Sequence, residues 1–287
     1  MVERRRVDGR DKPGQDGGRW RILTVSPPKT ASNRRQSAQK PRPSASKLRA
    51  GAAEVRQNAS DLASSPRPFA SQPIRFRTCA MALVLTLAPG VTYAPGFLDR
   101  ATQEALRDAI LAVLVEAPPF RPRMPRTGKA FSVRMSNCGP LGWVSDERGY
   151  RYQPDHPETG RSWPPIPASL LDAWSQLAPG APPPEACLIN LYDEKARMGL
   201  HQDRDEAELS APVVSLSLGA PALFRLGGAK RTDPTRSFRL ESGDGLAFGG
   251  PARLAFHGVD RILSGASTLL PEGGRINLTL RRVTRAE

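Results

Sequence analysis

The stretch Arg275-Ile-Asn-Leu-Thr-Leu-Arg281 alternates strictly between apolar and polar side chains. A period of two predicts a β-strand with three aliphatic residues on one face and two arginines, an asparagine and a threonine on the other. If the polar face points into a small barrel, two guanidinium groups are buried without acids nearby in the sequence, which requires a bound anion such as a dicarboxylic acid. A half-solvated edge strand gives the same pattern, so the stretch alone leaves both interpretations open.

Short runs of the same period fill the carboxyl-terminal half of the chain. They are separated by Gly, Pro and Asp turns and cover residues 186–192, 212–218, 222–226, 237–240, 245–248, 252–257 and 274–283. Several short strands at this spacing predict an antiparallel sandwich or barrel. Apolar residues at helical spacing predict helices over 99–116, with Asp99 as N-cap, and near 168–178. The expected fold class is therefore mainly β with flanking helices (α+β).

Charge is distributed unevenly along the 287 residues, whose formal net charge is +14. Residues 1–80 hold 18 Lys and Arg against 6 Asp and Glu, whereas residues 81–287 hold 24 against 22. The first segment lacks hydrophobic periodicity and is predicted to be a disordered basic extension. It is open whether this extension is inert, binds nucleic acid, directs targeting, or is never translated because synthesis starts at Met81. Residues 81–287 suffice for one domain.

Three cysteines, none in a CxxC pair, argue against a disulfide framework or a structural zinc cluster and suit a reducing compartment. No apolar run approaches the length of a membrane span. We therefore expect a cytoplasmic protein with no membrane partner. Nothing in the pattern indicates a coiled coil or an extensive exposed apolar face, so we expect a monomer.

Histidine is scarce, with only His156, His201 and His257 in the chain. The triplet His201-Gln-Asp203 places an imidazole and a carboxylate on one face of an extended segment. With His257 these residues make two histidines and one carboxylate, the set that binds non-haem Fe(II) and leaves open positions. A loop pair and an unrelated strand-end histidine explain the same residues. His156, in a Pro-rich polar loop, is expected to be exposed.

Two further segments carry polar residues that could serve a site. In Leu188-Ile-Asn-Leu-Tyr192, Asn190 and Tyr192 share a face, which either holds the same acid or forms a polar exterior. Residues 120–165 are dense in Arg, Gly, Pro and aromatics and predict loops and hairpins. Their basic residues either contact phosphates or form a solvated face. These are Arg121, Arg123, Arg126, Lys129 and Arg134.

Several of these motifs together resemble the AlkB family of DNA-repair dioxygenases. The resemblance covers roughly residues 82–285 and rests on Leu188–Tyr192, His201-Gln-Asp-Arg-Asp-Glu206, Ala211-Pro-Val-Val-Ser-Leu-Ser-Leu-Gly219 and Arg275–Arg281. Upstream matches are Ser136-Asn-Cys-Gly-Pro-Leu-Gly-Trp143, Gly149-Tyr150 and Arg161-Ser-Trp-Pro164. Ile276 and Pro140 depart from the family pattern, and neither is an implied ligand.

The resemblance implies a fold and a set of site residues. The fold is a double-stranded β-helix (jelly roll), with its core over 184–285 of an 81–287 domain and a nucleotide-recognition lid over 120–165. The implied catalytic and metal residues are His201, Asp203 and His257, which hold Fe(II). The implied 2-oxoglutarate ligands are Asn190, Tyr192, Arg275, Asn277 and Arg281. The implied substrate contacts are Trp143, which sandwiches the base with His201, and Tyr150, Asp205, Arg231 and Met135.

The resemblance also implies a reaction with Fe(II), 2-oxoglutarate and O2. Alkylated bases of the 1-methyladenine and 3-methylcytosine type are demethylated oxidatively, while 2-oxoglutarate becomes succinate and formaldehyde is released. The partner is single- or double-stranded DNA, and RNA stays open. Two alternatives remain at this point: a 2-oxoglutarate oxygenase of a protein or small molecule, and a catalytically silent β-barrel that binds nucleic acid.

Overall fold

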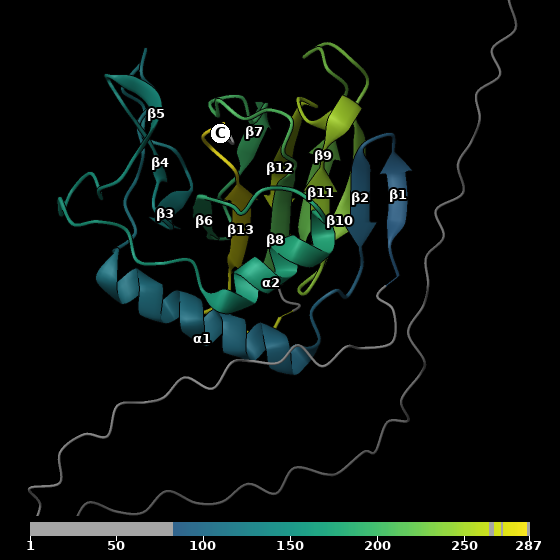
Figure 1. Ribbon diagram of the computed structural model, residues 1–287, viewed down its shortest axis with the longest axis horizontal. Helices are drawn as coiled ribbons and strands as arrows, with labels where there is room; N and C mark the ends of the chain where they lie inside the picture. Colours follow the sequence, from purple (N-terminus) through teal and green to yellow (C-terminus); the bar gives the residue numbers. More distant parts are fainter. Residues whose placement is uncertain (1–82, 264–266, 271, 286–287) are drawn as a thin grey trace, which may run out of the picture. The chain divides into compact units, whose positions relative to one another are not determined.

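The computed structural model describes residues 83–263, 267–270 and 272–285 (Figure 1). The extension predicted over residues 1–80 lies outside the described residues. None of the described helices has the length and apolar character needed to cross a membrane.

The strands form two antiparallel sheets and a separate hairpin. The larger sheet has the order β1-β2-β11-β8-β13-β6-β3 and the smaller one β10-β9-β12-β7. Strands of the larger sheet are β1 (Leu85–Ala88), β2 (Val91–Ala94), β3 (Arg134–Cys138), β6 (Ala186–Tyr192), β8 (Val213–Gly219), β11 (Gly245–Phe248) and β13 (Arg275–Arg281). Those of the smaller sheet are β7 (Met198–His201), β9 (Ala222–Leu226), β10 (Arg236–Leu240) and β12 (His257–Ile262). The hairpin pairs β4 (Gly142–Asp146) with β5 (Gly149–Gln153).

From β6 onward the chain passes back and forth between the two sheets. β6, β8, β11 and β13 belong to the larger sheet, whereas β7, β9, β10 and β12 belong to the smaller one. This winding produces the double-stranded β-helix, or jelly roll, with the polar face of β13 turned toward the smaller sheet. A pocket between the sheets is lined from both sides, for example by Asn277 of β13 and Phe224 of β9. Of the two interpretations that the sequence leaves open, the structure therefore supports the one in which the polar face points inward.

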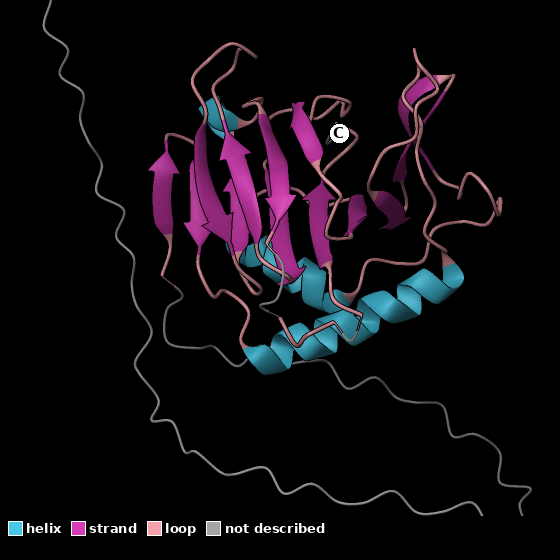
Figure 2. Ribbon diagram, turned by 180° about the vertical axis from the view of Figure 1, so that it is seen from behind, coloured by secondary structure: helices cyan, strands magenta, loops and turns pink. Residues whose placement is uncertain are grey.

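Two helices cover the opposite face of the larger sheet, α1 (Arg100–Glu116) and α2 (Ala168–Leu177) (Figure 2). Their apolar residues, among them Ile110 and Leu170, form one core cluster with the aliphatic face of β13, including Leu278. The carboxylate of Asp99 caps α1 by accepting a 2.8 Å hydrogen bond from the backbone N–H of Thr102. Both helices therefore agree with the sequence pattern to within one residue.

The strand predicted over 252–257 is wrong. A short 3-10 helix (Gly250–Ala252) occupies the start of this segment, and β12 begins only at His257. Gly250 has a φ of +49°, a left-handed conformation that glycine adopts without a steric penalty. Residues 252–256 thus form a turn, and its apolar side chains Ala252 and Ala255 pack against the core. The pattern also missed β1, β2 and β7, which have only four residues each.

We predict that Ile110→Ala destabilises the protein by about 2–5 kcal/mol, because it removes a fully buried side chain between α1 and the larger sheet. Leu111→Ala, next to it on the outer surface of α1 and 44% exposed, is the control and should change stability by less than about 0.5 kcal/mol. Urea unfolding measures both. Equal losses would show that α1 does not pack as described.

Candidate active site

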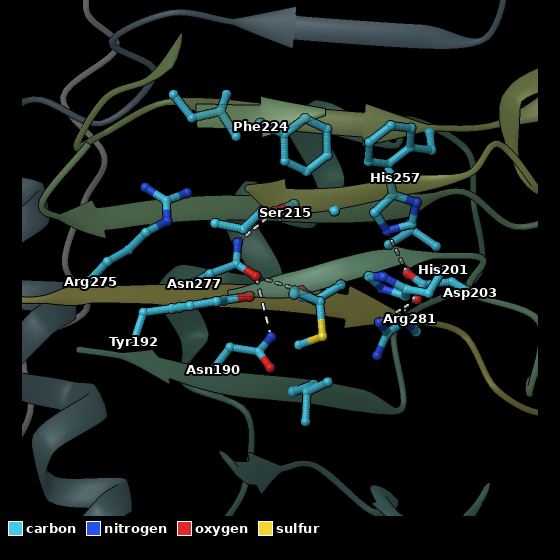
Figure 3. A pocket seen from close by; sticks show the side chains of 18 residues that line it. Asn190, Tyr192, His201, Asp203, Ser215, Phe224, His257, Arg275, Asn277 and Arg281 are labelled. Atoms are coloured by element: carbon cyan, nitrogen blue, oxygen red, sulfur yellow. Dashed lines mark hydrogen bonds and ion pairs between the residues drawn. The ribbon is translucent and has the colours of Figure 1, made fainter. Parts of the chain in front are cut away.

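Two histidines and one aspartate meet at one end of the smaller sheet. His201, the last residue of β7, lies directly opposite His257, the first residue of β12, in the strand register. Asp203 follows β7 by two residues, with its carboxylate oxygens 3.7 Å from His201 Nε2 and 3.9 Å from His257 Nε2. One ligand atom from each residue lies within 4.8 Å of the others (Figure 3). The structure therefore brings together the three residues expected to bind a metal.

Hydrogen bonds and charges prepare these side chains for a cation. The Nδ1 atoms of His201 and His257 lie 2.9 and 3.0 Å from the backbone carbonyls of Gly199 and Ala255, so each Nε2 lone pair is free to face Asp203. Burial, aided by His201, lowers the pKa of His257 to about 4, so this imidazole is neutral at pH 7. Burial alone would raise the pKa of Asp203, but Arg281 and the histidines hold it well below its usual range. Two imidazoles and a carboxylate are a ligand set that fits divalent iron.

The pocket extends from this triad along the polar face of β13 to Arg275 at its other end (Figure 3). Side-chain amides and hydroxyls bond to one another across three neighbouring strands. Asn277 of β13 donates to Ser215 Oγ of β8 at 2.7 Å and accepts from Asn190 Nδ2 of β6 at 3.3 Å. Tyr192 also lines this wall, while the smaller sheet supplies an apolar wall that includes Phe224. The five side chains expected to hold 2-oxoglutarate thus face one cavity.

Arg275 makes this end of the pocket suitable for an anion. The residue is 2% exposed, and burial lowers its pKa to about 10, which leaves it charged at pH 7. Its Nη2 donates to Ser217 Oγ at 2.7 Å, but its Nε has no partner among the described residues. No described carboxylate forms an ion pair with it. A buried cation without an acid is costly, so the residues fit the carboxylate of a bound dicarboxylic acid.

Arg281 differs from the expectation that both arginines of β13 lack acids. Its Nη2 lies 2.9 Å from Asp203 Oδ1, and its Nε lies 3.3 Å from Glu206 Oε1. Burial lowers the pKa of Arg281, but the two carboxylates outweigh it and raise the pKa above its usual value. These acids lie more than 70 residues away in the sequence and reach Arg281 only because the loop after β7 folds over β13. One nitrogen, Nη1, remains without a partner in the described part of the chain.

Sequence reasoning missed the other members of this ionic cluster. Arg253, 4% exposed, donates to the backbone carbonyls of Asp203 at 2.5 Å and Ala211 at 2.8 Å, and to Glu206 Oε2 at 3.1 Å. Glu206 also accepts from the hydroxyl of Tyr152 at 2.5 Å. The acid-rich run His201–Glu206 was a signal for Glu206, but no pattern marks Arg253, which lies in the turn before His257.

The hairpin of β4 and β5 carries two of the expected base contacts. Trp143 and Tyr150 stack with ring centroids 5.7 Å apart and an angle of 17° between planes. Trp143 Nε1 donates to Asp205 Oδ2 at 2.9 Å, which joins this aromatic pair to the segment that carries Asp203. Trp143, Tyr150 and Asp205 therefore lie together, as expected for residues that contact one ligand.

Met135 and Arg231 have other surroundings among the described residues. Met135 is buried in the core and faces Asn190 across the pairing of β3 with β6, and it is not among the residues lining the pocket. Arg231 donates to the backbone carbonyl of Leu200 at 2.8 Å and lies 5.8 Å from the centre of the Phe256 ring. It thus lies beside the strand that carries His201.

The expectation that His156 is exposed is wrong, since only 2% of it is accessible. Its Nε2 lies 2.8 Å from the carbonyl of Pro118, and its Nδ1 accepts the backbone N–H groups of Glu158 and Thr159 at 3.1 and 3.2 Å. Its ring packs 5.0 Å from that of Trp163. The histidine organises the loop internally, which a polar and Pro-rich composition does not reveal.

Comparison with known proteins agrees with this geometry. Residues 90–281 match the model of the 2OG-Fe(II) oxygenase superfamily. The alpha-ketoglutarate-dependent dioxygenase AlkB homolog of Caulobacter vibrioides is 57% identical over 206 residues, which are 72% of this chain and 93% of the relative. This chain belongs to the AlkB family of 2OG-Fe(II) oxygenases.

Two more relatives support the same assignment. AlkB of Escherichia coli is 40% identical over 205 residues, 70% of this chain and 94% of that protein. The solved structure of OsALKBH1 superposes with a TM-score of 0.60 at 33% identity, covering 70% of this chain and all of that one. As an AlkB-family dioxygenase the protein uses Fe(II), 2-oxoglutarate and O2. The resemblance and the jelly-roll fold are confirmed, while the individual residue roles stay predictions.

We predict that Arg253→Met destabilises this AlkB-family protein by about 3–5 kcal/mol, because it leaves Glu206 buried with one cation fewer. Arg239→Met is the control, since Arg239 pairs with Glu241 on the exposed surface and such pairs contribute about 0–1 kcal/mol. Chemical denaturation of both variants tests the difference. A small effect of Arg253→Met would show that the cluster does not support the fold.

Proposed function

We propose that this enzyme repairs alkylated nucleic-acid bases by oxidative demethylation, with 1-methyladenine and 3-methylcytosine as typical lesions. The observation that carries this proposal is the stacked pair Trp143 and Tyr150, bonded to Asp205 two residues from the metal ligand Asp203. An aromatic surface beside an acid suits a flat, positively charged base. The position next to the triad brings such a base to the site of oxidation.

The pocket residues divide into two groups in this proposal. His201, Asp203 and His257 hold Fe(II). Polar residues along the cavity wall, from Arg281 beside the triad to Arg275 at the other end, hold 2-oxoglutarate. That second group comprises Asn190, Tyr192, Arg275, Asn277 and Arg281. Together, Fe(II), 2-oxoglutarate and O2 supply the oxidation, in which 2-oxoglutarate is converted to succinate and CO2 and the N-methyl group gains a hydroxyl. The hydroxymethylated base then releases formaldehyde and is restored.

Arg275 binds the distal carboxylate of the cosubstrate at the end of the pocket away from the triad. Its Nε and the Oδ1 of Asn190 are the buried polar atoms there without partners in the described structure. A charge-assisted bond to Nε contributes about 1.5–3 kcal/mol, more than a neutral hydrogen bond. The opposite end of 2-oxoglutarate is then directed toward the triad.

Trp143, His201 and Asp205 act on the base. A methyl group on a Watson–Crick nitrogen is inside a duplex, so the base is flipped out or presented in a single strand. Stacking on an aromatic ring contributes about 1–3 kcal/mol per base. Trp143 and His201 then enclose the base, and Asp205, whose Oδ2 is bonded to Trp143, keeps Oδ1 for the cationic base edge. A lesion that cannot pair costs less to extrude.

The basic segment ahead of the hairpin supports contact with the nucleic-acid backbone. The loop is closed by a 2.9 Å hydrogen bond from Met124 N–H to the carbonyl of Lys129. Arg123 donates to the carbonyl of Gly128 within the loop, and Arg121 donates to that of Phe131 just after it. The guanidinium groups are thereby held on a fixed loop where phosphates could reach them.

We propose single- or double-stranded DNA as the partner, with RNA as the alternative, and a monomer acting in the cytoplasm. The free thiols of Cys138 and Cys187 suit that reducing compartment.

The function is tested with an oligonucleotide that carries one 1-methyladenine, incubated in air with enzyme, Fe(II) and 2-oxoglutarate. We expect a loss of about 14 mass units per lesion, the CH2 removed by demethylation, together with formaldehyde and succinate. Asp203→Ala should bind less iron and leave the lesion intact. Succinate formation with an unchanged base would contradict repair and favour an oxygenase of a protein or small molecule.

A second prediction concerns base recognition. Asp205→Ala should reduce the preference for cationic methylated bases over unmethylated ones by about tenfold, because it removes a charge-assisted contact. Turnover of 2-oxoglutarate in the absence of nucleic acid should change little. Asp260→Ala, which removes an exposed carboxylate on β12, is the control and should leave both quantities unchanged. Equal losses of both activities in Asp205→Ala would contradict this role.

A further inference from the structure

The hairpin of β4 and β5 is attached to the metal-binding segment at two adjacent residues. Trp143 and Tyr152 face each other across the hairpin register. Trp143 donates to Asp205, and the Tyr152 hydroxyl donates to Glu206 Oε1 at 2.5 Å. Both members of one cross-strand pair therefore hold the segment that begins with the metal ligand Asp203. The first contact involves the residues expected to hold the base, whereas the second joins the hairpin to the buried carboxylate of Glu206.

Glu206 continues this second contact into the ionic cluster. Its Oε1 lies 3.3 Å from Arg281 Nε, and its Oε2 lies 3.1 Å from Arg253 Nη2. Arg281 in turn contacts both carboxylate oxygens of Asp203, at 2.9 and 3.2 Å. A continuous path of hydrogen bonds and ion pairs thus runs from the Tyr152 phenol through the Glu206 carboxylate and the Arg281 guanidinium to the metal ligand Asp203.

The path is buried, which makes its geometry demanding. Glu206 and Arg281 are 6% and 5% exposed. Away from water, charge-assisted hydrogen bonds are strong and directional, and a carboxylate that accepts two hydrogen bonds and forms an ion pair with a further guanidinium has little freedom to turn. In the described cluster, Tyr152 is the donor that comes from the hairpin, and the two guanidinium groups come from the jelly roll. Movement of the hairpin therefore acts on Glu206 and, through it, on Arg281.

We propose that Tyr152 and Glu206 are positioning residues, which couple the hairpin to the metal ligand Asp203 through Arg281. The part of this inference that concerns nucleic acid rests on the proposed function, because the hairpin is there the surface that holds the base. Metal and 2-oxoglutarate in the pocket fix Asp203 and Arg281 and thereby order the hairpin. Coupling between two binding sites is reciprocal. If metal and 2-oxoglutarate raise the affinity for the base by some factor, the base raises the affinity for metal and 2-oxoglutarate by the same factor.

Hydrogen exchange tests the coupling without nucleic acid and without turnover. The probe is Mn(II), added anaerobically with 2-oxoglutarate to the full chain, and exchange of the β4 and β5 amides is compared with and without it. We expect exchange to slow about tenfold in the wild type, and Tyr152→Phe to abolish most of this effect, since it removes one hydrogen bond to a charged group. Tyr93→Phe is the matched control. It removes a 2.8 Å bond from a tyrosine to the buried Asp244, in the scaffold, and should keep the tenfold effect.

Binding of a single-stranded oligonucleotide with one 1-methyladenine gives a second measurement. Mn(II) with 2-oxoglutarate should lower its Kd about tenfold in the wild type and in Tyr93→Phe, and much less in Tyr152→Phe. Under turnover, Tyr152→Phe should also yield less formaldehyde per succinate. If Tyr152→Phe gains the same exchange protection as the wild type, the inference is overturned. If protection depends on Tyr152 but no variant binds the oligonucleotide, the coupling stands and the proposed function fails.

Discussion

Four charges at one end of the jelly roll must be buried together, and much of the site depends on their balance. Two carboxylates, Asp203 and Glu206, meet two guanidinium groups, Arg253 and Arg281. Removing any one of these side chains would leave an uncompensated charge out of water, so the four charges stabilise the fold only when all are present. Because Arg253 also bonds to the backbone carbonyls of Asp203 and Ala211, the cluster fixes the course of the loop as well as its side chains.

The two arginines of β13 show how one strand serves opposite purposes. Arg281 lies beside the loop after β7 and is neutralised by the protein itself, which keeps Asp203 anionic and oriented for a metal. Arg275, at the other end of the strand, meets hydroxyl and carbonyl groups but no described acid, so its charge is available to a ligand. The strand therefore sets a direction along the pocket, with a guanidinium that has no described acid at one end and the group of His201, Asp203 and His257 at the other.

The sequence predicts what depends on periodicity and little of what depends on loops. Alternation correctly placed Arg275 and Asn277 on one face of a strand, because the two faces of a strand are fixed by its geometry, but it did not decide whether that face points inward. It could not show that Arg281 is paired, since the pairing arises from a loop that folds back from a distant strand. His156 was misjudged for the same reason, as its burial depends on Pro118 and Trp163 and not on its neighbours in sequence. The assignment of particular residues to iron, 2-oxoglutarate or the base came from the family resemblance, because periodicity shows only which side chains share a face.

The winding of the chain explains why these functions converge on one short loop. His201 ends β7 in the smaller sheet, and the chain must then cross to β8 in the larger sheet. At the crossing, Asp203 faces the histidine pair and Arg281, Asp205 meets Trp143, and Glu206 meets Tyr152. A segment within either sheet would present alternate residues to opposite faces and could not bring all three to the site. The crossing thus links the two histidines, the stacked Trp143 and Tyr150, and the polar wall of β13, and only a few covalent bonds separate the residues that make these contacts.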